Sequence, residues 1–411
     1  MMQHYPLWTR NFTITTFGSL IPMMGNAVTK FALGRVVFDN TGSESLYAIF
    51  LAVATVARIL VPLFAGPYLD RASRRDTIIR VDVFYTLMFA VLAALTTANI
   101  FNYPLFLFIA VLLGCADSLY TVTYDSFYPE LISPGNFSKA YSIGSLLHPL
   151  ANTVMIPVAN VVYESVGVAP LFYFNTVAFF LTQWVERKIQ VQEKHLMPGA
   201  QPVQRPSYVK ELLNGVHYLK QEKGLMAITS LFFVTMLVLA MPDTLMLPYF
   251  TTHPVYTVQM YSFLSSSHTL GRIAGAIFHY RVPIAPRKKF AIALGVYTSI
   301  ALLQGPLLYL PYPMMIVSMF FYGVLGVTSF NIRTSGTQSY VPSHMRGRFN
   351  SLFTMITTSG TLVGQLMAGA LGERFPIPLI LFIFQGLYFL AALVTMLPMK
   401  KHVQQVYNQD I

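Results

Sequence analysis

The stretch Gly66-Pro67-Tyr68-Leu69-Asp70-Arg71-Ala72-Ser73-Arg74-Arg75 decides the fold, because a long apolar segment lies on each side of it. These segments cover about residues 44–68 and 77–100. Each is long enough for a helix that crosses a bilayer, which needs about 20 apolar residues. So short a hinge makes the two helices antiparallel neighbours. Arginines near span ends favour the cytoplasmic side, so we expect the hinge to lie in the cytosol.

Composition excludes an ordinary soluble protein. The chain has 411 residues, of which 55% are hydrophobic and 10% charged, whereas soluble domains are about 25% charged. The net charge of +11 does not predict nucleic-acid binding, because Lys and Arg lie mainly between the apolar segments. The single cysteine, Cys115, excludes an intrachain disulfide and a cysteine-clustered metal site. We expect no cofactor.

Apolar run lengths predict an all-α membrane protein with twelve transmembrane helices in two pseudo-symmetric six-helix bundles. The bundles cover residues 1–187 and 224–411, and residues 188–223 form a cytoplasmic linker whose helical pattern from Tyr208 predicts an amphipathic surface helix. The predicted spans are residues 11–37, 44–68, 77–100, 103–126, 138–162, 168–187, 224–250, 257–280, 288–309, 313–339, 346–371 and 376–398.

The two halves of the chain look related. A shift of 214 residues takes Arg58 to Arg272, Arg74 to Lys288 and Arg75 to Lys289. Parallel six-span repeats are a transporter architecture with the binding site at the repeat interface. Lys and Arg also gather in alternate loops, which predicts that both termini are cytoplasmic.

The hinge resembles the major facilitator superfamily, in which a Gly, an acidic residue four positions later and then basic residues join spans two and three. Gly66, Asp70, Arg71, Arg74 and Arg75 fit this pattern. The resemblance implies a gating latch in which Asp70 pairs with arginines or meets a helix N-terminus. The alternative is that the cluster only sets topology.

Three further stretches are similar to the macrolide-efflux and enterobactin-exporter branch of that superfamily, and the likeness covers the whole chain. This branch implies export. The stretches are Val37-Phe38-Asp39-Asn40-Thr41-Gly42-Ser43, Tyr128-Pro129-Glu130-Leu131 with Lys139-Ala140, and Pro342 with Arg346-Gly347-Arg348.

Two arginines, Arg58 and Arg272, fall near the middle of their spans, where an arginine costs about 2.5–3.5 kcal/mol unless it faces water or a partner. One hypothesis is that both face a central aqueous cavity and bind an anionic group of the substrate. The alternative is that each pairs with a buried acid. Helical spacing places Arg272 on a polar face, which comprises Ser265, His268, Thr269, Arg272 and His279; the candidate acids are Asp117, Asp125 and Asp243.

Other polar residues are candidates for coupling or substrate contact. Asp117 is a candidate for proton coupling, or a structural partner of Arg333 or Arg58, and His268 is a second proton candidate. Lys30 either pairs with Asp243 or extends toward the outer surface. Asn26 and Arg333 add polar groups near the middle of the membrane. Tyr120 and Tyr124 either stack on a hydrophobic substrate or only pack between helices.

These patterns predict a secondary active transporter that exports small amphipathic compounds by alternating access, coupled to protons. The chain lacks the phosphate-binding loop of ATP-driven pumps and the zinc motif H-E-x-x-H, so we expect no enzyme activity. An anionic metabolite or siderophore is the alternative substrate. A lipid flippase or a non-transporting membrane sensor is the alternative of another class. We expect a monomer in the cell membrane, with a small-molecule substrate, protons and lipid as its partners.

Overall fold

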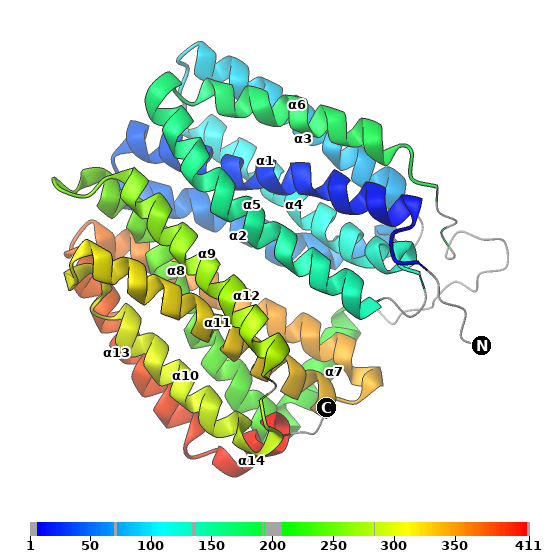
Figure 1. Ribbon diagram of the computed structural model, residues 1–411, viewed down its shortest axis with the longest axis vertical. Coiled ribbons are helices and arrows are strands. Elements are labelled where there is room, and N and C mark those ends of the chain that lie inside the picture. Colours follow the sequence, from blue (N-terminus) through cyan, green and yellow to red (C-terminus); the bar gives the residue numbers. More distant parts are fainter. Residues whose placement is uncertain are drawn as a thin grey trace. The chain divides into compact units, whose positions relative to one another are not determined.

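The computed structural model describes residues 6–69, 72–133, 137–190, 193, 208–282 and 284–408, and in this part the regular elements are all helices. Figure 1 shows their arrangement. The long helices are α1 (Arg10–Thr41), α2 (Glu44–Leu69), α3 (Arg74–Thr97), α4 (Tyr103–Phe127), α5 (Phe137–Val166), α6 (Ala169–Glu186), α8 (Lys223–Thr252), α9 (Val258–Arg281), α10 (Lys289–Gln304), α11 (Tyr312–Tyr340), α12 (Ser343–Gly372) and α13 (Ile377–Met396).

The long helices match the twelve predicted spans, with ends that differ by a few residues. The predicted amphipathic helix is α7 (Tyr208–Gln221), whereas the short α14 (Lys400–Tyr407) has no counterpart in the prediction. Short 3-10 turns occur at Tyr128–Leu131, Pro286–Lys288 and Leu307–Tyr309. Among the described residues, seven helices are long and apolar enough to cross a membrane by themselves.

Side-chain caps fix where several helices begin. The hydroxyls of Thr9, Ser73 and Thr257 accept hydrogen bonds from the backbone N–H three residues later, and Asn102 does the same for α4. Such caps satisfy the free N–H groups of a first helical turn. At the end of α1, Gly42 adopts φ +61°, a conformation that glycine adopts without strain.

The chain forms two compact units. The first comprises residues 1–42 and 53–204, and the second comprises residues 43–52 and 205–411. The start of α2 belongs to the second unit because Ser43 Oγ and Ser45 N both donate to the Glu373 carboxylate at the end of α12. The domain limits expected at residues 187 and 223 stay a prediction.

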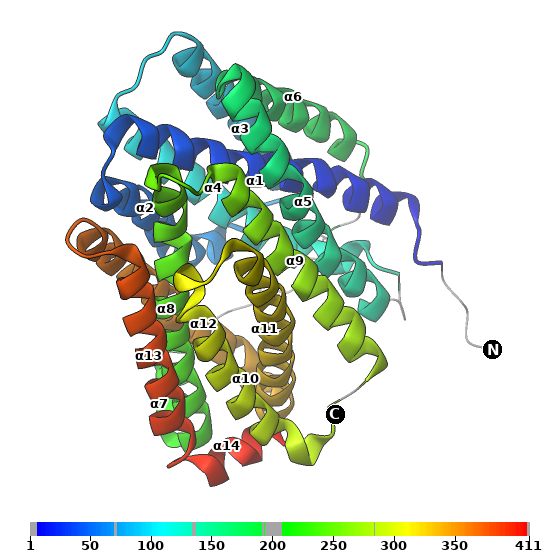
Figure 2. The same ribbon diagram turned by 60° about the vertical axis from the view of Figure 1, so that its left-hand side comes forward.

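Each unit repeats the same helix packing. In the first, α1 packs on α5 and α6, and α3 packs on α4 and α6; in the second, α8 packs on α12 and α13, and α10 packs on α11 and α13. Figure 2 shows α3 beside α6 in the first unit and α10 among the helices of the second unit. The first, third, fifth and sixth helices therefore have equivalent neighbours in both units, which supports the internal repeat.

A glycine contact shows the repeat at residue level. A Cβ on Gly114 of α4 would lie 3.0 Å from the Ala54 backbone of α2, and one on Gly323 of α11 would lie 2.1 Å from the His268 carbonyl oxygen of α9. The shift of 214 takes Ala54 to His268, and a shift of 209 takes Gly114 to Gly323. The second and fourth helices thus cross at equivalent positions, with backbones close enough to require glycine.

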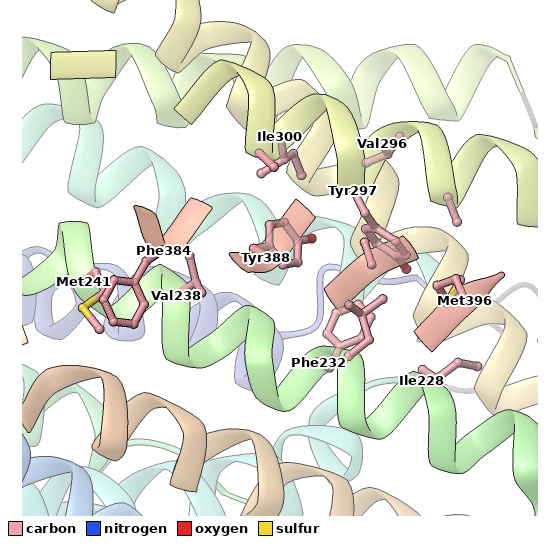
Figure 3. Close-up of a cluster of buried hydrophobic side chains, with 14 of the residues drawn as sticks. Ile228, Phe232, Val238, Met241, Val296, Tyr297, Ile300, Phe384, Tyr388 and Met396 are labelled. Atoms are coloured by element: carbon pink, nitrogen blue, oxygen red, sulfur yellow. The ribbon is translucent and has the colours of Figure 1, made fainter. Parts of the chain in front are cut away.

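Aromatic and aliphatic side chains fill the second unit's core. Figure 3 shows part of it, with residues from α8, α10 and α13 that point toward one another. Phe232 meets Tyr297 edge to face, with ring centroids 5.9 Å apart. The hydroxyl groups of Tyr297 and Tyr407 are hydrogen-bonded at 2.9 Å, which attaches α14 to α10. A buried tyrosine hydroxyl ordinarily has a hydrogen-bond partner, and these two hydroxyls provide it for each other.

Candidate functional site

Arg58 and Asp117 form an ion pair in the first unit. Arg58 Nη2 lies 3.1 Å and Nε 3.3 Å from Asp117 Oδ2. Both residues lie at least ten residues from the ends of α2 and α4, which is roughly 15 Å along each helix. The two side chains are 60% and 33% exposed, so the pair is not part of the packed core. The structure therefore shows Arg58 paired with an acid, and substrate binding by Arg58 stays a prediction.

Arg272 occupies the equivalent place in the second unit but has no such partner. The shift of 209 that takes Gly114 to Gly323 takes Asp117 to Gly326, and open space surrounds the position of a Cβ there. Arg272 is exposed, and within the described part of the chain no carboxylate lies within 4.0 Å of it. Both units therefore have the arginine, whereas only the first unit has the acid at the equivalent position.

The neighbours of Arg272 provide aromatic surface and an acid. The rings of His268 and Tyr322 are stacked, with centroids 4.6 Å apart and an interplanar angle of 13°. Arg272 is close enough to act electrostatically on both, and the exposed Asp243 of α8 acts on Tyr322. We call Asp243, His268, Arg272 and Tyr322 the α9 polar face. It combines a free cation, an anion and flat rings on one unit.

Other residues of the predicted polar face bond to their own unit. His279 Nε2 lies 2.7 Å from Thr328 Oγ1 of α11, and Thr269 donates to the Ser265 carbonyl oxygen one turn earlier. The His279 contact therefore joins α9 to α11, whereas Arg272 is exposed.

Arg333 lies in an aromatic cage. Its guanidinium is 4.8 Å from the Phe353 ring centroid, 5.2 Å from that of Phe232 and 5.3 Å from that of Phe330. Cation–π attraction of this kind stabilises a partly desolvated guanidinium. Arg333 therefore has a packing role in the second unit, which the sequence pattern did not indicate.

The remaining candidates lie in the first unit. Tyr120, Tyr124 and Tyr128 form a stacked ladder with centroid spacings of 5.8 and 5.3 Å. Tyr120 and Tyr124 also pack against a buried cluster around Phe127, as expected for helix packing. Lys30 is exposed and Asn26 half-buried on α1; the pairing of Lys30 with Asp243 stays a prediction.

The cationic hinge is attached to two acids. Arg74 Nη1 lies 2.6 Å from Glu130 Oε1. Glu193, after α6, accepts hydrogen bonds from Ser73 Oγ at 2.6 Å and from the backbone N–H groups of Arg74 and Arg75 at 2.7 and 3.3 Å. Gly66 lies in the last turns of α2, and Asp70 and Arg71 lie outside the described residues. The latch role of the hinge therefore stays a prediction.

Sequence reasoning missed an ion network at the other end of the first unit. Arg35 Nη2 contacts Asp39 at 3.2 Å and Glu164 at 3.0 Å, and Tyr163 donates to Asp39 at 2.6 Å. Both acids lie beyond the ends of the predicted spans at residues 37 and 162, but α1 and α5 extend far enough to include them. The four-residue spacing of Arg35 and Asp39 is the signal that predicts their contact on one helix.

The described part of the chain has twelve long helices in two units with the same packing, which is typical of membrane transport proteins. The Major Facilitator Superfamily model matches residues 12–364. The chain belongs to this superfamily. It is thus a transport protein and not an enzyme, and its superfamily is the one that the hinge motif resembles.

One relative is similar over almost the whole chain. Macrolide efflux protein A of Streptococcus pyogenes is 20% identical over 387 residues, which cover 91% of this chain and 92% of that protein. The predicted likeness to macrolide-efflux proteins is confirmed at this level of identity.

Solved transporters share the fold. A D-xylose-proton symporter has a TM-score of 0.72 at 16% identity and covers 99% of this chain and 100% of its own. A bacterial homologue of the iron transporter ferroportin, in an inward-facing state, has a TM-score of 0.69 at 14% identity, with coverages of 96% and 98%. A peptide transporter POT in complex with sulfate has a TM-score of 0.71 at 13% identity, with coverages of 97% and 96%.

Proposed function

We propose that this chain is an alternating-access exporter of small amphipathic molecules. The α9 polar face supports the proposal, because an amphipathic molecule needs both a flat apolar surface and a polar anchor. The stacked rings of His268 and Tyr322 supply the first, and the unpaired guanidinium of Arg272 supplies the second. The likeness to macrolide efflux protein A supports export as the direction.

Protons are the proposed coupling ion. Asp243 and Asp117 are exposed or half-exposed carboxylates within long helices, and carboxylates within membrane spans are typical of proton pathways. His268, beside Arg272, is the third candidate. We place the protein in the cell membrane as a monomer with both termini cytoplasmic, on the basis of its Lys and Arg distribution.

The test uses the purified full-length chain in proteoliposomes with a radiolabelled macrolide as probe. We expect macrolide movement to depend on an imposed pH gradient. Replacing Arg272 by Gln should lower it about ten-fold, the loss that follows from removing one charged hydrogen bond. Arg374→Gln, an exposed residue after α12, is the matched control. Equal transport by the Arg272→Gln and Arg374→Gln variants would remove Arg272 from the site, and no macrolide movement in the wild type would overturn the proposal.

An anionic solute is the second candidate, because no carboxylate of the described residues lies within 4.0 Å of the Arg272 side chain. A guanidinium binds carboxylate or phosphate through two parallel hydrogen bonds. Transport of a radiolabelled dicarboxylate in the same proteoliposomes distinguishes an anionic substrate from an amphipathic one. Dicarboxylate transport that a macrolide does not inhibit favours the anionic substrate, whereas macrolide transport alone favours the first proposal.

A further inference from the structure

Two acidic side chains are buried together in the first unit. Asp82 of α3 is fully buried and Glu186, the last residue of α6, is 4% exposed. The two carboxyl groups lie within hydrogen-bonding reach of each other. Two ionised carboxylates contain no donor, so such a hydrogen bond requires a proton on one of them.

Neither acid forms an ion pair with a cation of the described residues. In the described part of the chain, no Lys, Arg or His nitrogen lies within 4.0 Å of either carboxyl group. Both oxygens of Asp82 and Oε2 of Glu186 receive no hydrogen bond from any donor that the structure places nearby. Burying two unpaired charges side by side is prohibitively unfavourable, and sharing one proton removes one of them.

A small cavity lies beside Glu186. It leaves about 10 Å³ for the centre of a water molecule and is lined by Thr15, Arg75, Ile78, Tyr124, Phe127, Glu186 and Ile189. That volume holds about one water. The Thr15 hydroxyl, on a residue 3% exposed, is buried there without a partner. It is an independent sign of a polar occupant, because buried hydroxyls are ordinarily hydrogen-bonded.

The groups that face the pair come from three helices. Tyr85 lies on α3 beside Asp82, and Tyr120 and Tyr124 reach toward Glu186 from α4. From α1, Thr15 lines the cavity and Gly18 faces the Glu186 side chain. Among the described residues that line the cavity, Arg75 is the basic one, and its guanidinium donates to the Arg187 carbonyl oxygen. A pair that holds one proton therefore carries one negative charge opposite one positive charge.

We propose that Asp82 and Glu186 form a proton-binding site that holds one exchangeable proton, loaded through a water in the cavity beside Thr15 and Arg75. In loading, one O–H bond of a hydronium ion breaks and one forms on the Glu186 carboxylate, which leaves water and a hydrogen bond to Asp82. No electrons are transferred. The bound proton is independent of the proposed function, whereas a role for this site in coupling rests on it.

Infrared difference spectroscopy of the full-length chain in lipid tests the site directly. We expect a pH-dependent C=O stretch of a buried protonated carboxyl group that is lost in Asp82→Asn and in Glu186→Gln. Each of these amides has the shape of the acid it replaces and donates the same hydrogen bond, so both variants should fold. Asp76→Asn, an exposed acid in the first turn of α3, should leave the stretch unchanged.

A stretch that persists in both amide variants, or that is absent from the wild type at every pH, would overturn the proposal. The role in coupling has its own readout in proteoliposomes. Asp82→Asn should lose transport driven by a pH gradient and keep exchange of labelled for unlabelled macrolide. If the wild type moves no macrolide, the proposed function fails, but the infrared result still decides whether the proton is bound.

Discussion

Arg58 and Arg272 show how one residue type takes different roles in two copies of a repeat. Both sit at equivalent depths on the second helix of their unit. Arg58 contacts Asp117 at 3.1 Å, whereas the position equivalent to Asp117 is Gly326. An arginine with an acid beside it contributes mainly to holding α2 against α4. An arginine without one has hydrogen-bond donors to spare, and we propose that Arg272 uses them to bind the substrate.

Breaking the Arg58–Asp117 pair should reveal this difference. We expect Arg58→Gln and Asp117→Asn each to lower thermal stability, and the double variant to lose less than their sum, with a coupling energy of up to about 1 kcal/mol because the pair is partly exposed. Thermal unfolding of purified protein in detergent measures it. Arg272→Gln is the control and should show no coupling to Asp117→Asn. Strict additivity of Arg58→Gln and Asp117→Asn would contradict an energetically important pair.

Helix pairs in this protein depend on close backbone contact, most clearly between α9 and α11. A Cβ at Gly323 would lie 2.1 Å from the His268 carbonyl oxygen and 2.7 Å from the Arg272 backbone nitrogen. The neighbours are backbone atoms and cannot rotate away as a side chain would. Gly323 thus sets the distance between the two helices, and with it the place of Arg272.

Gly323→Ala should therefore destabilise the protein, by about 1–3 kcal/mol or more, because the two helices must separate. Gly326→Ala, one turn later on the same helix, meets no atom within 4 Å and should be neutral or stabilising by up to about 1 kcal/mol through helix propensity. Melting temperatures in one detergent compare the two. Similar melting temperatures for these variants would show that α9 and α11 are not in backbone contact.

The start of α3 is a second element whose position depends on one residue. Glu193 accepts hydrogen bonds from the backbone N–H groups of Arg74 and Arg75 and from Ser73. A carboxylate at a helix N-terminus satisfies free donors and is favoured by the helix dipole. The segment after α6 therefore holds the beginning of α3.

Glu193→Ala should loosen the first turn of α3 by about 1 kcal/mol, which corresponds to roughly five-fold faster hydrogen exchange at the Arg74 and Arg75 amides. Exchange followed by mass spectrometry measures this. Gln190→Ala, in the same segment, should have no effect, because only the backbone of Gln190 bonds to Asn11. Unchanged exchange in Glu193→Ala would exclude the cap.

At the scale of the whole molecule, the repeated packing explains why a chain with few strongly apolar helices still folds as a membrane protein. In the described part of the chain, seven helices are long and apolar enough to cross a membrane by themselves. The others, such as α1 and α12, are more polar, and they pack on partners in their own unit. Some of their polar groups form hydrogen bonds there, as with Asn175 Nδ2, which donates to Thr29 Oγ1 at 2.6 Å.

An even number of spans places both termini on one side of the membrane, and the charge distribution predicts the cytoplasm. A green fluorescent protein fused after Ile411 should fluoresce, and alkaline phosphatase at that position should be inactive. Phosphatase inserted at Gly167, between α5 and α6, should be active. Active phosphatase at the C-terminus would reverse the predicted orientation.

The sequence by itself determined the number and limits of the long helices, the superfamily and the repeat, because apolar run length and hinge charges are local properties of the chain. It also identified Arg58 and Arg272 as unusual, because a charge within an apolar span is visible without a structure. Only the tertiary structure decided which arginine has a partner, and it alone brought Asp82 against Glu186 and Glu193 against α3. Those contacts join residues 59 to 120 positions apart, and no local pattern specifies which helix faces cross.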